Sequence, residues 1–436
     1  MGPGPLLSHV DRHGLNAHGP DYLRAMATET SKQALAEVHL HAGKAKSVQR
    51  GHPWVFSGAI ARLIVEEEPP AAGDWVRVVD HEGTFIGWGH WGTGSIAVRI
   101  VSREEDALPD VAWWATKLKA CLAVRTAAGL WDPEGDHRGG FRWVHGEGDG
   151  LSGLVVDCYS DIVVLQTHSM GMHKVRHDIA EGLRIAMGDR LKGIVDKSLS
   201  LLRKLDVDLP DGASDEWLMG QGAPDGTPFE EHGITYTVDP ITGQKTGFFL
   251  DQRDNRRLLM EWVGNRPVLN AFSYTGGFSL AALQGGSPHV ISLDASRPAV
   301  DLAQRHAEAN GFGDRHEAVC SDVLSYIGSV DTLPPVVILD PPAYAKSRAN
   351  RHKAVKGYQR LNEAAMRKMP ADSLLWTFSC SQVVDAQLFE DTIVSAAIRS
   401  GRTVRILRRL GQPADHPTLA GHSEARYLKG LVLHVT

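Results

Sequence analysis

Residues 270–283 read NAFSYTGGFSLAAL, in which an apolar strand ends in a glycine turn and a helix follows. The same alternation recurs downstream, with predicted strands HVISLD (289–294), PVVILD (335–340) and LLWTFS (374–379) separated by helical segments. These strands lack alternating polar residues, so both of their faces are expected to be covered. The pattern predicts an α/β unit with a doubly wound, mostly parallel sheet over residues 231–436.

The glycine turn and two acids indicate a ligand-binding edge of this sheet. Glycines let the backbone approach a ligand closely. Asp294 ends the next predicted strand about 20 residues on, where a carboxylate can bind ribose hydroxyls. Another aspartate follows the third strand. The predicted cofactor contacts at this edge are Phe272, Tyr274, Thr275, Gly276, Asp294 and Asp322.

The composition of the turn favours one nucleotide cofactor over another. A dinucleotide fold cradles a pyrophosphate with G-x-G-x-x-G, and residues 274–277 (YTGG) do not follow that pattern. S-adenosylmethionine (SAM) carries a ribose and an adenine but no phosphate. The turn and the ribose acid therefore favour SAM over NAD. The structural alternative is an ordinary glycine-rich loop.

The fourth predicted strand ends in VVILDPPAYAKSR (336–348). Asp340 falls at the carboxyl edge of the sheet, where open α/β folds bind ligands. Pro341 and Pro342 cannot continue a central strand and should direct the chain outward. Tyr344 then offers a flat face for a base. A simple turn that stops the strand is the alternative.

The fifth predicted strand ends in Cys380, which we expect beside Asp340 because strands four and five should be neighbours. Ser379 and Ser381 flank this cysteine at the mouth of the predicted site. A lone cysteine is otherwise a small buried hydrophobe. That interpretation is retained for Cys121, Cys158 and Cys320.

Length and composition predict several domains in a chain of 436 residues. Residues 1–36 are expected to be a disordered extension. Residues 37–105 are expected to form a small β-barrel from the short strands EVHLHAG, HPWVFSGAI, DWVRVVD, GTFIGWG and SIAVRIV. Residues 106–230 are expected to form a central α/β domain, in which LVVDCYSDIVVLQ (154–166) predicts a hairpin and MHKVRHDIAEGLRIAM (172–187) a helix. No apolar run reaches the roughly 18 residues of a membrane helix. Four scattered cysteines fit a reducing, cytoplasmic setting, and the 21 histidines show no metal-ligand spacing, so no metal is expected.

The formal charge of -6 requires any nucleic-acid binding to come from local patches. Residues 343–362 hold six basic residues and no acid: Lys346, Arg348, Arg351, Lys353, Lys356 and Arg360. Such a run can bind phosphates, although a solvated helix face is the alternative. A second cluster (Arg402, Arg405, Arg408 and Arg409) is a weaker candidate. Lys245 and Arg253 are expected to meet the SAM carboxylate or an RNA phosphate, or else to be surface charges.

Several motifs together carry a family resemblance. They are EGDGLSGLVVD (147–157), GQKTGFFLDQRDNR (243–256), NAFSYTGGFSL (270–280), DPPAYAKS (340–347), TFSCS (377–381), ADHP (414–417) and YLKG (427–430). Because it carries these motifs together, the chain resembles RNA 5-methylcytosine methyltransferases of the large-subunit ribosomal RNA methyltransferase I type. One departure is Tyr344, where phenylalanine is common.

The resemblance implies a PUA-like RNA-binding barrel, a central α/β domain and a class I SAM-dependent methyltransferase domain. It implies C5 methylation of a cytosine in 23S ribosomal RNA, with Cys380 as nucleophile and Asp340 as the motif acid. It also suggests a homodimer.

The residues support a mechanism in which a thiolate adds to C6 of cytosine, because C5 alone is too poor a nucleophile. Cys380 should then lie where its pKa is lowered. Asp340 could stabilise the charge on the ring, and a base in a helix would need to be flipped out. One alternative is exocyclic-amine methylation of adenine or guanine by the DPPAY motif. Another is a non-catalytic RNA-binding or ribosome-assembly protein.

Overall fold

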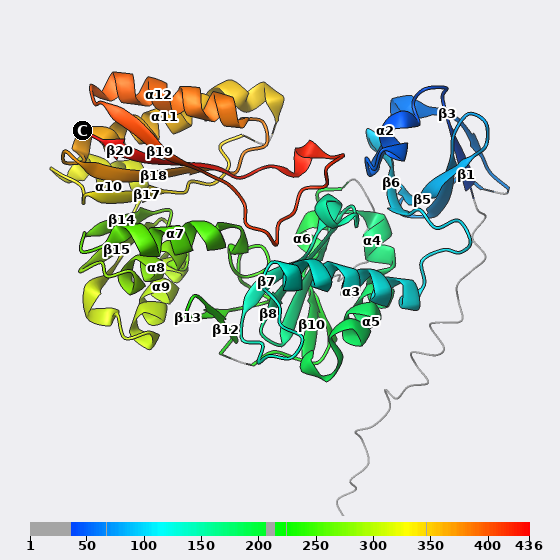
Figure 1. The fold of residues 1–436 in the computed structure, drawn as a ribbon, viewed down its shortest axis with the longest axis horizontal. Helices are drawn as coiled ribbons and strands as arrows, with labels where there is room; N and C mark the ends of the chain where they lie inside the picture. Colours follow the sequence, from blue (N-terminus) through cyan, green and yellow to red (C-terminus); the bar gives the residue numbers. More distant parts are fainter. Residues whose placement is uncertain (1–35, 67, 206–213, 224, 346) are drawn as a thin grey trace, which may run out of the picture.

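The computed structural model describes residues 36–436 apart from 67, 206–213, 224 and 346 (Figure 1). The described residues form a six-stranded, a five-stranded and a seven-stranded sheet, together with a two-stranded hairpin. The predicted disordered extension lies outside the described residues, except for Ala36, which begins the first strand.

The six-stranded sheet forms the N-terminal unit, in the order β2-β6-β5-β4-β1-β3. Its strands are β1 (Ala36–Leu40), β2 (Trp54–Phe56), β3 (Ile60–Ile64), β4 (Trp75–Val79), β5 (Phe85–Trp91) and β6 (Ile96–Ser102). Strand β3 was not predicted, because its partly exposed sequence IARLI lacks a clean alternation. Valines from four strands fill the core: Val38, Val55, Val76, Val78 and Val98.

The central unit is a five-stranded sheet in the order β11-β10-β9-β8-β7. Its elements are α3 (Val111–Ala127), β7 (Gly140–His145), β8 (Leu154–Tyr159), β9 (Ile162–Thr167), α4 (Met170–Lys174), α5 (Arg176–Met187), β10 (Gly193–Asp196), α6 (Leu199–Leu202) and β11 (Glu216–Met219). The hairpin predicted from LVVDCYSDIVVLQ is confirmed, since β8 and β9 pair antiparallel. The helix predicted over 172–187 is two helices, α4 and α5, with Val175 between them.

A two-stranded hairpin separates the central sheet from the last one. It consists of β12 (Thr227–Glu231) and β13 (Ile234–Val238), paired antiparallel. A domain boundary at residue 230 would cut this hairpin one residue before its first strand ends. We therefore propose the boundary between Met219, where the central sheet ends, and Thr227.

The seven-stranded sheet runs β16-β15-β14-β17-β18-β20-β19. Its strands are β14 (Val268–Ala271), β15 (Val290–Asp294), β16 (His316–Cys320), β17 (Val336–Leu339), β18 (Ser373–Ser379), β19 (Val404–Leu410) and β20 (Lys429–Val435). Strand β20 is antiparallel to both of its neighbours, while the pairs on the other side of β18 are parallel. The strand order reverses between β14 and β17, which is where such sheets bind ligands.

Helices cover both faces of this sheet, as the apolar strands predicted (Figure 1). They are α7 (Arg253–Val263), α8 (Gly277–Gln284), α9 (Arg297–Ala309), α10 (Val323–Ser329), α11 (Arg351–Lys368) and α12 (Ala386–Ser400). One core joins the sheet to α11 and α12 through residues such as Leu361 and Phe389. The other joins it to α7 and α8 through residues such as Leu259 and Phe278.

No helix among the residues described is both long and apolar enough to cross a membrane.

Candidate active site

The turn after β14 is locked to the end of β15. The φ angles of Phe272 and Tyr274 are 59° and 47°, and that of Gly276 is 84°, so three residues of the turn adopt left-handed backbone conformations. The backbone N–H of Tyr274 donates to Asp294 Oδ2 at 3.0 Å, and Ser296 N–H donates to Asp294 Oδ1 at 2.9 Å. The structure thus brings the predicted glycine turn and the predicted ribose acid together.

This edge fits a nucleoside. Each Asp294 oxygen keeps a free lone pair beyond the single hydrogen bond that it accepts. Ser273 Oγ is buried and has no hydrogen-bond partner within the described part of the chain, which leaves a polar group for a ligand. Asp322 is exposed and caps α10 by accepting from Ser325 N–H at 2.8 Å. Hydroxyl and carboxylate groups suit the ribose of SAM, and residues 270–283 contain no lysine or arginine for a phosphate.

Asp340 lies at the end of β17 and is held by a glutamine. Gln252 Nε2 donates to Asp340 Oδ2 at 3.0 Å, and Asn255 Nδ2 donates to Gln252 Oε1 at 2.6 Å. Burial, together with the nearby carboxylate of Asp251, raises the pKa of Asp340 to about 7. A substantial fraction of Asp340 is therefore protonated at neutral pH.

Cys380 follows β18, which pairs in parallel with β17. Because Leu339 is in register with Thr377, the residues that follow the two strands emerge at the same edge, as expected. The expected lowering of the thiol pKa is not found. Burial raises the pKa of half-buried Cys380, the Asp340 carboxylate raises it further, and Lys245 only partly opposes them. Sequence reasoning missed this because it counted neither the burial of the thiol nor the negative charge of Asp340 beside it.

Two lysines approach the thiol from separate segments. Lys245 is exposed, with its ammonium nitrogen 4.3 Å from the centre of the Phe249 ring. Lys429 donates to the carbonyls of Ser381 at 2.6 Å and Tyr427 at 2.7 Å. Burial lowers the pKa of Lys429 to about 8, although Cys380 opposes this shift. Lys429 was not selected from the YLKG motif, because nothing along the sequence connects it to Cys380.

The Asp-Pro-Pro segment turns the chain away from the sheet. Pro341 is buried and Pro342 is exposed. The Tyr344 ring is half-buried and lies 4.7 Å from the Tyr358 ring, centre to centre. A Cβ at Gly357 would come within 2.9 Å of the Tyr344 ring, so this glycine lets α11 approach it. Stacking of a base on Tyr344 stays a prediction.

The surroundings of Arg253 contradict the prediction that it binds SAM or an RNA phosphate. Its side chain is buried and donates to the Gly140 carbonyl. Its other nitrogens lie 3.5 Å from Glu231 Oε2 and 3.4 Å from Asp415 Oδ2. A guanidinium surrounded by these protein acceptors is not available to a ligand, so Arg253 joins α7 to the central sheet and to the C-terminal loop.

The basic run after Asp340 is on the surface. Arg348, which precedes α11, is exposed, and so are four residues of the helix: Arg351, Lys353, Lys356 and Arg360. Lys346 lies outside the described residues. In the second basic cluster, Arg402 donates to carbonyls that include that of Thr436, and Arg409 pairs with Glu390 at 2.8 Å. Those two arginines therefore have structural partners.

An acid from the motif at 243–256 was overlooked. Asp251 is buried beside the site and accepts a 2.7 Å hydrogen bond from Tyr427 Oη. Asp251 also raises the pKa of both Asp340 and Cys380. The sequence feature that could have pointed to Asp251 is the hydrophilic pair Asp251 and Gln252 directly after the apolar FFL run. The partners of this pair, Tyr427 and Asp340, lie far away in sequence.

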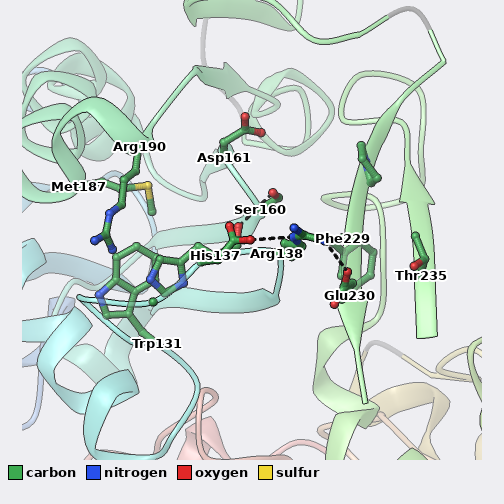
Figure 2. A pocket seen from close by; sticks show the side chains of 13 residues that line it. Trp131, His137, Arg138, Ser160, Asp161, Met187, Arg190, Phe229, Glu230 and Thr235 are labelled. Atoms are coloured by element: carbon green, nitrogen blue, oxygen red, sulfur yellow. Dashed lines mark hydrogen bonds and ion pairs between the residues drawn. The ribbon is translucent and has the colours of Figure 1, made fainter. Parts of the chain in front are cut away.

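A cavity of about 580 Å³ lies apart from these residues, between the central sheet and the β12–β13 hairpin (Figure 2). None of the predicted site residues lines it. Several of its rings and charges have partners within the protein. The ring centres of His137 and Trp131 lie 3.4 Å apart, and the Arg138 guanidinium lies 2.9 Å from Asp136 Oδ2 and 3.7 Å from Glu230 Oε1. The arrangement therefore indicates packing between two units.

Comparison with known proteins decides the family. The model of the S-adenosylmethionine-dependent methyltransferase family matches residues 198–433, and that of a PUA-like domain matches residues 38–103. A ribosomal RNA large subunit methyltransferase I from Alteromonas mediterranea is 36% identical over 409 residues, which cover 92% of this chain and 99% of the relative. The chain belongs to this methyltransferase family.

Other relatives agree with this assignment. The ribosomal RNA large subunit methyltransferase I of Photobacterium profundum is 35% identical over 91% of this chain and 99% of its own length. A solved structure from Streptococcus mutans, assigned as a SAM-dependent methyltransferase, superimposes with a TM-score of 0.75 at 21% identity, covering 91% of this chain and 99% of that one. The family member described here thus has a PUA-like domain and a SAM-dependent methyltransferase fold, and its cofactor is SAM.

Proposed function

We propose that the protein methylates C5 of a cytosine in 23S ribosomal RNA through a covalent bond between Cys380 and C6 of the base. The observation that carries the proposal is the pair Asp340 and Cys380, which follow adjacent parallel strands at one edge of the sheet. The large-subunit ribosomal RNA is taken from the names of the relatives.

Cys380 supplies the nucleophile. Its sulfur bonds to C6, which moves electron density to C5 and makes that carbon nucleophilic. Bound SAM supplies an electrophilic methyl group. When C5 takes the methyl group, S-adenosylhomocysteine would be the leaving group. A general base then takes the C5 proton, and cleavage of the bond between sulfur and C6 restores the aromatic ring and releases the Cys380 thiolate.

Asp340 fits a role in moving the thiol proton. Because its pKa is raised to about 7, chiefly by burial, its carboxylate can accept a proton from Cys380 at neutral pH. The protonated carboxyl can then donate to N3 of cytosine as negative charge develops on the ring. Gln252 occupies Oδ2 and leaves Oδ1 for this task. The raised thiol pKa is compatible with this scheme, since neutralising Asp340 removes one of its causes.

The exposed basic residues of α11 support an RNA substrate. Lys353, Lys356 and Arg360 follow one another at helical spacing on a helix that begins shortly after Asp340. We infer that they bind phosphates on either side of the target base, which would be presented unpaired or flipped out.

The test is transfer of labelled methyl groups from SAM to unmodified 23S ribosomal RNA, followed by digestion to nucleosides. Wild type should form 5-methylcytidine, and Cys380→Ala should lose at least about a thousandfold in rate, as expected for removal of a nucleophile. Cys320→Ala is the matched control, because Cys320 is also a half-exposed free thiol. It should retain wild-type activity.

Other outcomes would contradict the proposal. A labelled methyladenosine or methylguanosine that persists in Cys380→Ala would establish exocyclic-amine methylation at the Asp-Pro-Pro motif instead. RNA binding without transfer to any 23S fragment or ribosomal particle would favour a non-catalytic assembly role.

A further inference from the structure

Three distant segments meet beside the N-terminal unit. Trp54 in β2 donates its indole N–H to Glu147 Oε1 at 3.1 Å and to Ser152 Oγ at 3.0 Å in the central unit. The loop between β19 and β20 reaches this junction from the methyltransferase sheet (Figure 1, red). There Gly421 packs so closely that a Cβ would come within 2.9 Å of the Arg50 carbonyl.

Three metal-ligating side chains converge at this junction. His52 comes from the N-terminal unit, and His422 and Glu424 come from the loop. One ligand atom from each lies within 4.8 Å of the others, the only such group of three among the residues the structure describes. His422 Nδ1 is 3.4 Å from Glu424 Oε2, and His52 Nε2 is 3.9 Å from Glu424 Oε1.

The imidazole of His422 is buried without a hydrogen-bond partner among the described residues. Its side chain is 2% exposed, and neither of its ring nitrogens has a hydrogen-bond partner in the described residues. A buried imidazole without any partner is costly. A metal ion bound by one ring nitrogen would remove part of that cost.

His52 brings Nε2 to the cluster, 3.9 Å from Glu424 Oε1. Its Nδ1 accepts a hydrogen bond from the Trp54 backbone N–H at 3.1 Å. Metal binding at Nε2 would require the ring proton to move to Nδ1, which then faces the Trp54 carbonyl at 3.3 Å. A hydrogen bond from the second ring nitrogen to a backbone carbonyl is the common support of a metal-bound histidine.

We propose that His52, His422 and Glu424 bind one divalent transition-metal ion of the Zn²⁺ class and thereby fix the PUA-like unit to the methyltransferase domain. Two imidazoles and a carboxylate suit zinc, with water in the fourth position of a tetrahedron. Moderate tightening of the three side chains would bring their ligand atoms to about 2.0–2.2 Å from the ion. The site differs from that of methyl transfer, where no metal ligand is needed. Sequence spacing could not show it, because the ligands come from opposite ends of the chain.

The experiment uses the full-length protein stripped of metal by a chelator and then titrated with Zn²⁺ in a calorimeter. We expect one site of micromolar affinity or better, and a rise of several degrees in the unfolding temperature on zinc addition. Glu424→Gln and His422→Gln should each weaken binding at least tenfold and abolish that rise. The matched control is His81→Gln, which removes an exposed histidine 3.7 Å from Glu82 on the same unit and should behave as wild type.

Glu424→Gln decides the result if His422→Gln fails to fold, because the Glu424 side chain is 54% exposed. The other histidines of the chain give a background of weak binding that every variant shares. Equal zinc affinity in wild type and Glu424→Gln, or bound zinc that leaves the unfolding temperature unchanged, would overturn the proposal.

Discussion

At the scale of single residues, ionisation of Asp340 lowers the stability of the folded protein as the pH rises. Burial raises its pKa to about 7 from an ordinary value of 3.8. Because the folded-state pKa exceeds the unfolded one, the stability that Asp340 contributes is fully present below about pH 4 and is lost as pH rises through about 7.

Asp340→Asn, which cannot ionise, should therefore be more stable than wild type at pH 8 and similar to it near pH 4. We expect a gain of about 1–2 kcal/mol at pH 8, below the full linkage value because the side chain is only half-buried. Urea unfolding at both pH values measures it. Asp322→Asn is a control of opposite sign, since backbone and side-chain hydrogen bonds from Ser325 lower the pKa of Asp322. If Asp340→Asn were more stable than wild type by the same amount at both pH values, the gain would not come from the buried charge of Asp340.

Lys245 should make the Cys380 thiol more reactive. The lysine lowers the pKa of Cys380 against the larger effects of burial and Asp340. Lys245→Met should slow alkylation of Cys380 by iodoacetamide at pH 8 by about two- to fivefold, the effect of one exposed charge. The measurement needs a Cys320→Ser background, because Cys320 is also partly exposed.

Lys353→Met, which removes an exposed lysine from α11, is the matched control and should leave the alkylation rate unchanged. The slowing should shrink in 1 M salt, where the charge is screened. A Lys245→Met rate equal to wild type at low salt would exclude this role.

Sequence reasoning placed Asp340 and Cys380 at one edge because both follow apolar strands of a parallel sheet. It missed Gln252, Asp251 and Lys429, whose partners become neighbours only after folding. It misassigned Arg253, because an arginine inside a family motif looks the same in sequence whether it binds a ligand or a buried acid.

At the scale of elements, α11 should provide salt-dependent affinity for RNA. Lys353→Ala with Lys356→Ala should lower the slope of log affinity against log salt by about 0.7 per removed charge on single-stranded RNA. Fluorescence anisotropy at several salt concentrations gives the slope. Arg405→Ala with Arg408→Ala removes the same charge from exposed positions of β19. A slope change of equal size in that control would show that net charge, not α11, is responsible.

The parallel strands of the methyltransferase sheet could be predicted because buried parallel strands are continuous apolar runs. Elements with mixed burial were harder to predict. The strand β3 was missed because most of its side chains face solvent, and the break at Val175 is not marked by glycine or proline. The proposed boundary between Met219 and Thr227 differs from the one predicted at residue 230, because hairpin pairing between β12 and β13 cannot be read from hydrophobicity alone.

At the scale of the whole molecule, buried hydrogen bonds hold the methyltransferase and central units together, among them the bond from Arg253 to the Gly140 carbonyl of β7. Arg253→Met should destabilise the protein by about 3–5 kcal/mol, because Asp415 and Glu231 would lose a buried partner. The SAM affinity of the folded variant should stay within about twofold of wild type, because a substitution away from the ligand is expected to change ligand affinity only slightly. Urea unfolding and calorimetry measure the two quantities.

Arg257→Met on the same helix is the control, because Arg257 is exposed and pairs with Glu261 at 3.7 Å. It should change stability by less than about 0.5 kcal/mol. Loss of SAM binding in Arg253→Met at unchanged stability would restore the cofactor role that the sequence had suggested.

The loop that carries Asp415 also bears on the kinetics of folding. The Asp415 carbonyl accepts from Arg125 Nη2 at 2.8 Å and its carboxylate accepts from the Arg142 N–H at 2.9 Å, across 290 and 273 positions of the chain. Contacts of such high contact order close late, because the intervening chain must first be ordered. Each sheet should therefore form before this loop docks, and docking should be the slow phase of refolding. A protease added during that phase should cut residues 411–428 before it attacks any strand.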